Sequence, residues 1–232
     1  GDLGTSLRTK RPVTVEISNR YVNTVQLTLM SLAWSSVAGI ILGVWSGKNR
    51  SKWQDYTGMT VAVSGISMPS FWIGFMLIIV FSVKLGWFPT TGAESLKSLV
   101  LPAFTLGTSV AAVVARFTRS SLIEVLKEDY IRTARAKGIK EKAVIWKHAF
   151  RNSMISVVTV IGLQFGFLLG GSVVTESVFA FPGLGSLLIE SVNYRDYPAI
   201  QSLILIFSLH FILINLLVDV LYAVLNPEIK LS

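Results

Sequence analysis

Cysteines are absent from this sequence, and charged residues are scarce. Among its 232 residues there is no cysteine, which excludes a disulfide framework, a thiolate metal site and a cysteine nucleophile. Charged residues make up 15% of the chain and hydrophobic residues 52%, whereas soluble domains carry about a quarter charged residues. This deficit of charge indicates a membrane protein.

Five stretches lack Asp, Glu, Lys and Arg over about 20 residues, the length that a bilayer requires. They are Tyr21–Gly47, Tyr56–Val83, Ser98–Ala115, Ser153–Thr175 and Tyr197–Val218. One such stretch alone, above all the short third one, is also compatible with a buried helix of a soluble protein. Five together are not, because too little polar surface remains to cover them. We therefore expect an all-α membrane protein with five spans in this chain.

The net charge of +8 is unevenly distributed. Most Lys and Arg residues lie at 48–52 and at 116–151, with Lys230 in the tail, and the alternate loops carry few. The positive-inside rule then places 116–151 and the C-terminus in the cytoplasm. The N-terminal segment becomes external, although it carries Arg8, Lys10, Arg11 and Arg20. An external start suits a sixth helix upstream of this sequence.

These features divide the chain into three parts. Residues 1–20 are expected to form an external segment and residues 21–225 a transmembrane domain with a cytoplasmic loop at 119–151. Residues 226–232 are expected to form a cytoplasmic tail. Within the second span, Pro69 predicts a kink because proline removes a backbone hydrogen bond.

A basic segment at 128–152 interrupts the apolar chain. The chain from Ser120 to Lys137 has no Pro or Gly, and its apolar residues recur at three- and four-residue steps, which predicts one unbroken amphipathic helix. Gly138 stands where a C-cap glycine would end that helix, and a second amphipathic piece follows. The residues alone leave open a helix on anionic lipid, a docking knob for a soluble partner and, least favoured, a nucleic-acid site.

Sequence motifs for nucleotide binding, catalysis or ion coupling are weak or incomplete in this chain. Residues 43–49 come close to the phosphate-binding loop motif but do not match it, because the glycines are one residue too close and Asn49 replaces Ser or Thr. A serine protease motif is incomplete at Ser64, and the lone His210 is expected to bond a carbonyl or Asn215. All Asp and Glu lie at or beyond the span ends, whereas an ion-coupled transporter places carboxylates near mid-membrane.

The basic segment resembles the EAA loop of permease subunits of bacterial ABC importers, in the branch for dipeptides, oligopeptides and nickel. The resemblance rests on DYIRTARAKG at 129–138 and HAxRN at 148–152, and continues through FPGLG at 181–185 and RDYP at 195–198. Residues 62–67 and 162–172 are nearest to glutathione-importing members. Arg132 replaces the usual first Glu of the signature, and 148–151 replaces its Ile-x-Leu-Pro, as is usual in the peptide branch. Arg132 leaves an acidic contact to the ATPase in doubt.

The resemblance implies the transmembrane domain of a type I ABC importer in the bacterial inner membrane, a sixth N-terminal helix being absent here. Implied partners are a second homologous permease subunit, two cytoplasmic ATPase subunits, an extracytoplasmic substrate-binding protein and membrane lipids, with no nucleic acid. The chain would be no enzyme and would bind no cofactor or metal, since ATP and Mg belong to the ATPases. The expected cargo is a small peptide, glutathione among them. A nickel or metal-chelate import permease and an ion-coupled secondary transporter are the alternatives.

Two sets of residues follow from this resemblance. Those expected to dock the ATPase are Tyr130, Arg132, Thr133, Ala134, Arg135, Ala136, Lys137, Gly138 and His148. Those expected along the substrate path or its gate are Met68, Pro69, Phe71, Gln164, Phe165, Phe181 and Gly183.

Overall fold

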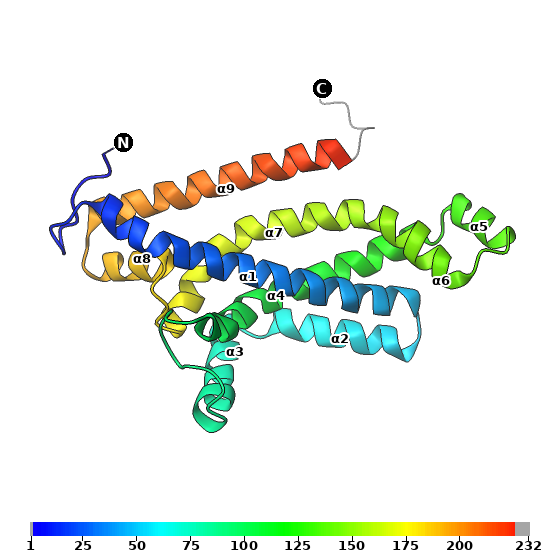
Figure 1. Ribbon diagram of the computed structural model, residues 1–232, viewed down its shortest axis with the longest axis horizontal. Coiled ribbons are helices and arrows are strands. Elements are labelled where there is room, and N and C mark those ends of the chain that lie inside the picture. Colours follow the sequence, from blue (N-terminus) through cyan, green and yellow to red (C-terminus); the bar gives the residue numbers. More distant parts are fainter. Residues whose placement is uncertain (1, 226–232) are drawn as a thin grey trace. The chain divides into compact units, whose positions relative to one another are not determined.

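The computed structural model describes residues 2–225, with side chains as far as Val220. The tail expected at 226–232 lies outside the described residues. Figure 1 shows the helices in chain order. They are α1 (Val13–Lys48), α2 (Trp53–Ser67), α3 (Ser70–Leu77), η1 (Ile78–Lys84), α4 (Leu96–Val125), α5 (Asp129–Ala136), α6 (Glu141–Ala143), η2 (Val144–Ala149), α7 (Phe150–Val178), α8 (Leu184–Asn193) and α9 (Tyr197–Leu225), where η marks a π-helix.

The long helices agree with the expected all-α membrane fold. In the described part of the chain, α1, α4, the continuous run Glu141–Val178 and α9 are each long and apolar enough to cross a membrane. Counting α2 with the pair α3 and η1 as one broken span raises the number to five. Apart from the start of α9 at Tyr197, the helices begin and end beyond the uncharged stretches, because a helix can continue past the bilayer into polar surroundings.

The second span is broken rather than kinked. Helix α2 ends at Ser67, and α3 begins at Ser70. Between them Pro69 has an extended conformation, with φ −59° and ψ 136°. Proline has no N–H to continue a helix, and its ring disfavours the helical conformation of the preceding residue, here Met68. The predicted kink is therefore corrected to an interruption with Pro69 as the residue before α3.

The Cα positions cluster into two compact units, which are described separately below. The first comprises the chain up to Ala33, Met68–Gly107 and Phe165–Asn215. The second comprises Trp34–Ser67, Thr108–Gln164 and the described residues from Leu216 to the end of α9.

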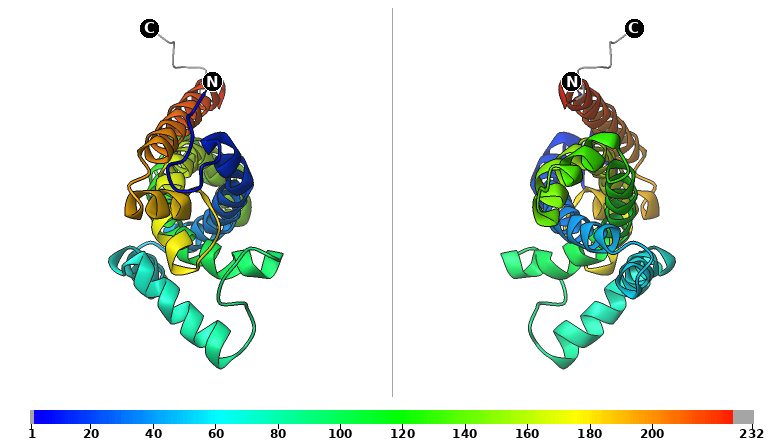
Figure 2. Two further views of the ribbon diagram at one scale, coloured as in Figure 1. Left: turned by 90° about the vertical axis from the view of Figure 1, so that its left-hand side faces the viewer. Right: turned by 90° about the vertical axis from the view of Figure 1, so that its right-hand side faces the viewer.

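The core of the first unit joins the start of α1 to α8 and the start of α9. Its buried residues are Val13, Ile17, Leu184, Leu187, Ala199 and Leu203. The N-terminal segment passes beside these helices (Figure 2, left). There Ser6 Oγ and the N–H of Leu7 donate hydrogen bonds to the Asp196 carboxylate, which precedes α9. The expectation that His210 bonds a carbonyl is confirmed, since its Nδ1 lies 2.8 Å from the oxygen of Ile206.

The core of the second unit lies between α1, α4 and the segments that follow α4. One cluster of small residues, Ala62, Ala112 and Ala115, packs α2 against α4. The crossing of α1 and α4 is equally close, because a Cβ on Gly39 would lie 2.7 Å from the carbonyl oxygen of Ala111. Such close approach of helix backbones is typical of small residues in membrane helices.

Candidate functional site

A knob formed by α5, the turn at Gly138, α6 and η2 is the candidate functional site. Figure 1 shows α5 and α6 side by side. Helix α5 is separate from α4, which ends at Val125, and Glu128 before α5 is extended with ψ 147°. The unbroken helix predicted from Ser120 to Lys137 is therefore wrong. A straight continuation of α4 would carry the apolar stripe of α5 away from the core, whereas the break lets the stripe fold back and become buried.

The turn after α5 has the geometry predicted for Gly138. This residue has φ +76°, the left-handed region that favours glycine. Its N–H donates to the Arg135 carbonyl at 2.9 Å, and the N–H of Ile139 donates to the Ala134 carbonyl at 3.3 Å. This pair of hydrogen bonds is a Schellman motif, which satisfies the last carbonyls of the helix.

The inner face of the knob is fixed by apolar packing. Ile131, Val144 and Ala149 are fully buried, and Ala134 is 7% exposed, in one cluster with Val44 of α1 and Leu122 of α4. Ala134 was expected to contact an ATPase through its small side chain. The structure instead places its methyl group inside the chain's own core, where it lets α5 lie close to its neighbours.

The outer face of the knob carries the exposed candidates. Arg132, Thr133, Arg135, Ala136 and Lys137 are exposed, as are Tyr130 and Gly138, and His148 is half-buried. Their docking role stays a prediction.

Two polar contacts brace this outer face. The Arg135 guanidinium donates to the Glu141 carboxylate at 2.7 and 3.1 Å, which closes a loop across the Gly138 turn. The Tyr130 hydroxyl accepts a 2.7 Å hydrogen bond from Asn152 at the start of α7. The knob is thus held at the turn and at its base.

A buried ion pair supports the same unit and was not foreseen from the sequence. Asp55, 3% exposed, accepts hydrogen bonds from Arg119 at 2.6 and 2.7 Å and from the N–H of Ser51 at 3.0 Å. The pair joins the first turn of α2 to α4, and Arg119 lies one turn before Leu122 of the knob's cluster. The available signal was the single acidic residue in the basic stretch from Lys48 to Asp55.

The residues expected along a substrate path differ in their exposure. Met68, Pro69 and Phe71 are exposed, and Gln164 and Phe165 are half-buried on α7. Phe181 and Gly183 are buried in the first unit. Phe181 lines a cavity of about 280 Å³. The other residues around this cavity are Arg20, Glu176, Ser177, Ala180, Pro182, Ser186, Ile189 and Glu190. Their role in transport stays a prediction.

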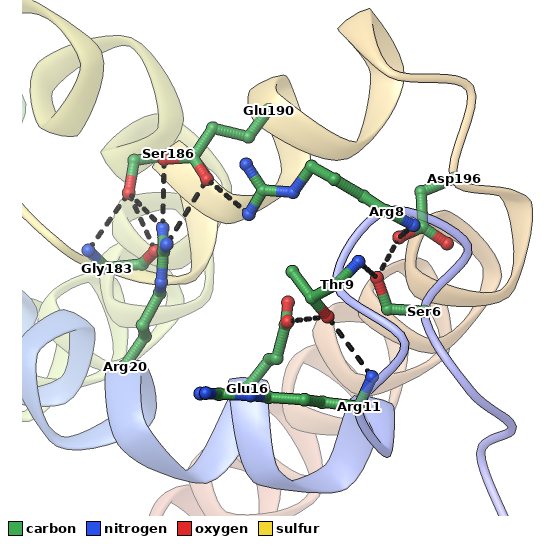
Figure 3. Close-up of polar contacts among 10 residues, drawn as sticks. All are labelled: Ser6, Arg8, Thr9, Arg11, Glu16, Arg20, Gly183, Ser186, Glu190 and Asp196. Carbon is green, nitrogen blue, oxygen red and sulfur yellow. Dashed lines mark hydrogen bonds and ion pairs between the residues drawn. The ribbon is translucent and has the colours of Figure 1, made fainter.

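A polar network joins α8 to the N-terminal part of the first unit. Figure 3 shows Arg8 and Arg20 converging on Glu190. The Arg8 guanidinium lies 3.0 Å from the carboxylate, and Arg20 donates to both of its oxygens at 3.2 Å. Partial burial disfavours the charged form of Glu190, but the hydrogen bonds and charges of the two arginines outweigh it. The pKa of Glu190 therefore lies below its ordinary value.

In the described part of the chain, no group of three or more His, Asp and Glu side chains is placed to hold a metal ion.

Comparisons with known proteins identify relatives of this chain. Residues 39–231 match the family described as the binding-protein-dependent transport system inner membrane component. The chain is 58% identical over 230 residues to the glutathione transport system permease protein GsiC of Pectobacterium atrosepticum, covering 99% of this chain and 75% of that protein. It is 57% identical over the same length to GsiC of Escherichia coli K12, with the same coverage.

Solved structures share the fold. A chain of the inward-facing MetNI methionine ABC transporter superposes with a TM-score of 0.77 at 19% identity, covering 91% of this chain and 96% of that one. A chain of an amino acid ABC transporter crystallised with histidines gives a TM-score of 0.69 at 16% identity, covering 90% and 93%. At such identities the likeness establishes the fold alone.

Proposed function

The chain belongs to the family of inner membrane components of binding-protein-dependent transport systems, the permease subunits of ABC importers, and we propose that its cargo is a small peptide, with glutathione the first candidate. The observation that carries the proposal is the 58% identity to a glutathione transport permease over 99% of this chain. Family membership removes the ion-coupled secondary transporter from consideration. A metal-chelate permease remains an outcome of the test.

We further propose that the knob is the surface on which a cytoplasmic ATPase subunit docks. A docking element must transmit the movement of the ATPase to the membrane helices without deforming. The buried cluster under α5, the Arg135–Glu141 contact and the Schellman turn all support such stiffness. The exposed cations on α5 supply the contact surface. ATP and Mg would then be bound by the ATPases, and this chain would contribute no catalytic residue.

The proposed topology follows from the charge distribution. Residues 116–151 face the cytoplasm, and the segment 1–20 and α8 face the other side of the membrane. The complete importer then holds a second permease subunit, two ATPases and an extracytoplasmic binding protein. Cysteine substitutions at Lys140 and Glu190 test this arrangement in whole cells. A membrane-impermeant thiol reagent should label position 190 alone, and labelling of position 140 alone would invert the topology.

The cargo is tested by uptake in cells that lack their own glutathione importer. The full-length protein is expressed with its companion permease, ATPases and binding protein, and uptake of labelled glutathione, a labelled dipeptide and nickel is compared. Saturable glutathione uptake that needs ATP hydrolysis supports the proposal. Accumulation of nickel without glutathione would replace the peptide with a metal chelate as the cargo.

A further inference from the structure

The segment between α7 and α8 has the composition of a flexible connection. Ala180 lies in the left-handed region with φ +44°, and Pro182 and Gly183 follow. Its packing is that of a core. Phe179 and Phe181 are 2% and 1% exposed, so both aromatic rings are out of solvent. The composition of this segment predicts that α8 can move relative to α7, whereas its packing predicts that α8 is held in place.

A buried glutamate explains the packing. Glu176, in the last turn of α7, is 0% exposed. One carboxylate oxygen accepts a hydrogen bond from Thr24 Oγ1 of α1 at 2.8 Å, and the other accepts one from the N–H of Ser186 in α8 at 3.0 Å. The Thr24 hydroxyl in turn accepts the N–H of Leu184 at 2.8 Å. The carboxyl group thus supplies hydrogen-bond acceptors at the α8 N-terminus, where the first N–H groups of a helix lack partners within the helix.

The backbone beside Glu176 leaves no room for another arrangement. A Cβ on Gly183 would overlap the Glu176 carboxylate, and a Cβ on Gly185 would lie 2.5 Å from Cα of Val173. The Glu176 carbonyl also accepts the Phe181 N–H at 2.8 Å, which closes the chain tightly around the carboxylate. The two glycines are therefore needed so that α8 can approach the end of α7 this closely.

We infer that Glu176 is a positioning residue that fixes α8 to the end of α7 and to α1, so that these three segments move as one body during the transport cycle. The contacts bypass the connecting segment, because they bind α8 directly to two other helices. Helix α8 is consequently not an independent lid. The inference rests on the chain's role as a permease and does not depend on the identity of the cargo.

Two engineered cysteines test this directly, since the sequence has none of its own. Val174 of α7 and Val192 of α8 are 47% and 52% exposed. Spin labels at Val174→Cys and Val192→Cys in the assembled full-length importer report the distance between the two helices. We expect one narrow distance distribution that is the same without nucleotide and with trapped ATP. A distribution that shifts between these two states in the otherwise unchanged protein would overturn the inference.

Substitutions then show which side chain holds α8 in a fixed position. Glu176→Gln keeps the shape but replaces one of the two acceptor oxygens with an NH2 donor, which weakens the paired contacts with Thr24 and Ser186, so the distribution should broaden or split. Thr24→Val should broaden it as well, and Thr24→Ser, which keeps the hydroxyl, should restore it. Glu190→Gln is the matched control on the exposed side of α8 and should leave the distribution narrow.

The pair of Thr24 variants keeps the test decisive if Glu176→Gln does not assemble. Narrow distributions in both Glu176→Gln and Thr24→Val would contradict the inference. Stimulation of ATP hydrolysis by the loaded binding protein gives the functional readout, and we expect it to fall in Thr24→Val while the basal rate stays unchanged. Equal loss of basal and stimulated rates would instead indicate a purely structural role. Failure of the wild-type importer to take up glutathione would refute the proposed cargo and leave the spin-label result intact.

Discussion

Two short helices, α8 in the first unit and α5 in the second, each lie beyond the end of a long membrane helix and each bury an apolar face, but their polar contacts differ. The ten-residue α8 packs into the core of its unit and is also held by polar contacts with the buried side chains of Glu176 and Thr24. The eight-residue α5 packs Ile131 and Ala134 into a core, and its polar contacts lie on the exposed face. Buried hydrogen bonds fix an orientation, whereas apolar packing fixes a face and leaves the opposite one free. The contrast therefore favours a positioned element in α8 and a presented surface in α5.

The two groups of ion pairs, at Asp55 and at Glu190, differ in their exposure to solvent. Asp55 is nearly inaccessible when paired with Arg119, so this pair belongs to the interior that supports the knob. Glu190 retains 38% side-chain exposure while it is shared by two arginines. Exposed pairs contribute up to about 1 kcal/mol, and buried pairs cost several kcal/mol when one partner is removed. Loss of one charge should therefore destabilise the protein more at the Asp55–Arg119 pair than at Glu190.

The largest expected effect on function is at the knob's turn. Gly138→Val places a β-branched side chain at φ +76°, which costs about 1–2 kcal/mol locally and should redirect α6 and η2 away from the docking surface. We expect insertion into the membrane to be normal, with loss of ATPase co-purification and of uptake together.

The matched control is Gly138→Asn, because Asn tolerates the left-handed region better than other residues. It should keep most of the ATPase bound. Full recovery of the complex with Gly138→Val would contradict the docking role and favour a helix that lies on the lipid surface.

The next effect concerns the buried ion pair. Asp55→Ala leaves the Arg119 guanidinium without its acceptor and the Ser51 N–H unpaired, and should destabilise the second unit by about 3 kcal/mol. Thermal unfolding of the purified subunit in detergent measures the loss. The double variant Asp55→Leu with Arg119→Met removes both charges and should recover part of it. Equal midpoints for wild type and Asp55→Ala would show that the pair contributes nothing.

A smaller effect separates two glycines of α7. Both glycines line a cavity of about 380 Å³. A Cβ on Gly166 would lie 3.1 Å from the ring of Phe211, whereas nothing lies within 4 Å of one on Gly170. Gly166→Leu should cost about 1–3 kcal/mol by overpacking against α9, and Gly170→Leu should be tolerated better. Detergent melting of the two variants, side by side, decides this. Equal melting would show that the ring of Phe211 moves aside freely.

Sequence patterns predicted the elements of this fold better than their contacts. Absence of charge located the spans, and the glycine after a cationic helix end located the turn at Gly138. The break after Val125 was missed because apolar spacing is the same in one helix and in two successive ones. Ala134 was counted among the docking residues because its small side chain would allow a partner to approach closely, and only the three-dimensional position of Leu122 and Val44 shows that it is buried within this chain.

Glu176 illustrates a different limit of sequence reasoning. It stands just past an uncharged stretch that ends at Thr175, where a glutamate normally meets solvent or headgroups. Its burial arises because α8 turns back onto α7 and brings its own N–H groups to the carboxylate. The glycines at 183 and 185 were recognisable as part of a motif, but the carboxylate that they accommodate was not.

The smallest effect is the pH response of Glu190, and it tests the exposed end of the α8 attachment. Its pKa in the folded chain is lowered, so the pair with Arg8 and Arg20 contributes stability above the unfolded pKa, and this contribution is lost as the pH falls through the lower folded value. Because the carboxylate is partly exposed, solvent screening keeps the contribution under about 1 kcal/mol. Hydrogen exchange of the α8 amides, followed from neutral pH into the acidic range, should show increased opening that Glu190→Gln no longer shows. Asp196 also has a lowered pKa, since the hydrogen bonds from Ser6 and the Leu7 and Arg8 amides outweigh its burial, and it titrates in both proteins. Only the difference between the two proteins therefore reports on Glu190, and identical pH profiles would mean that the arginines hold α8 without it.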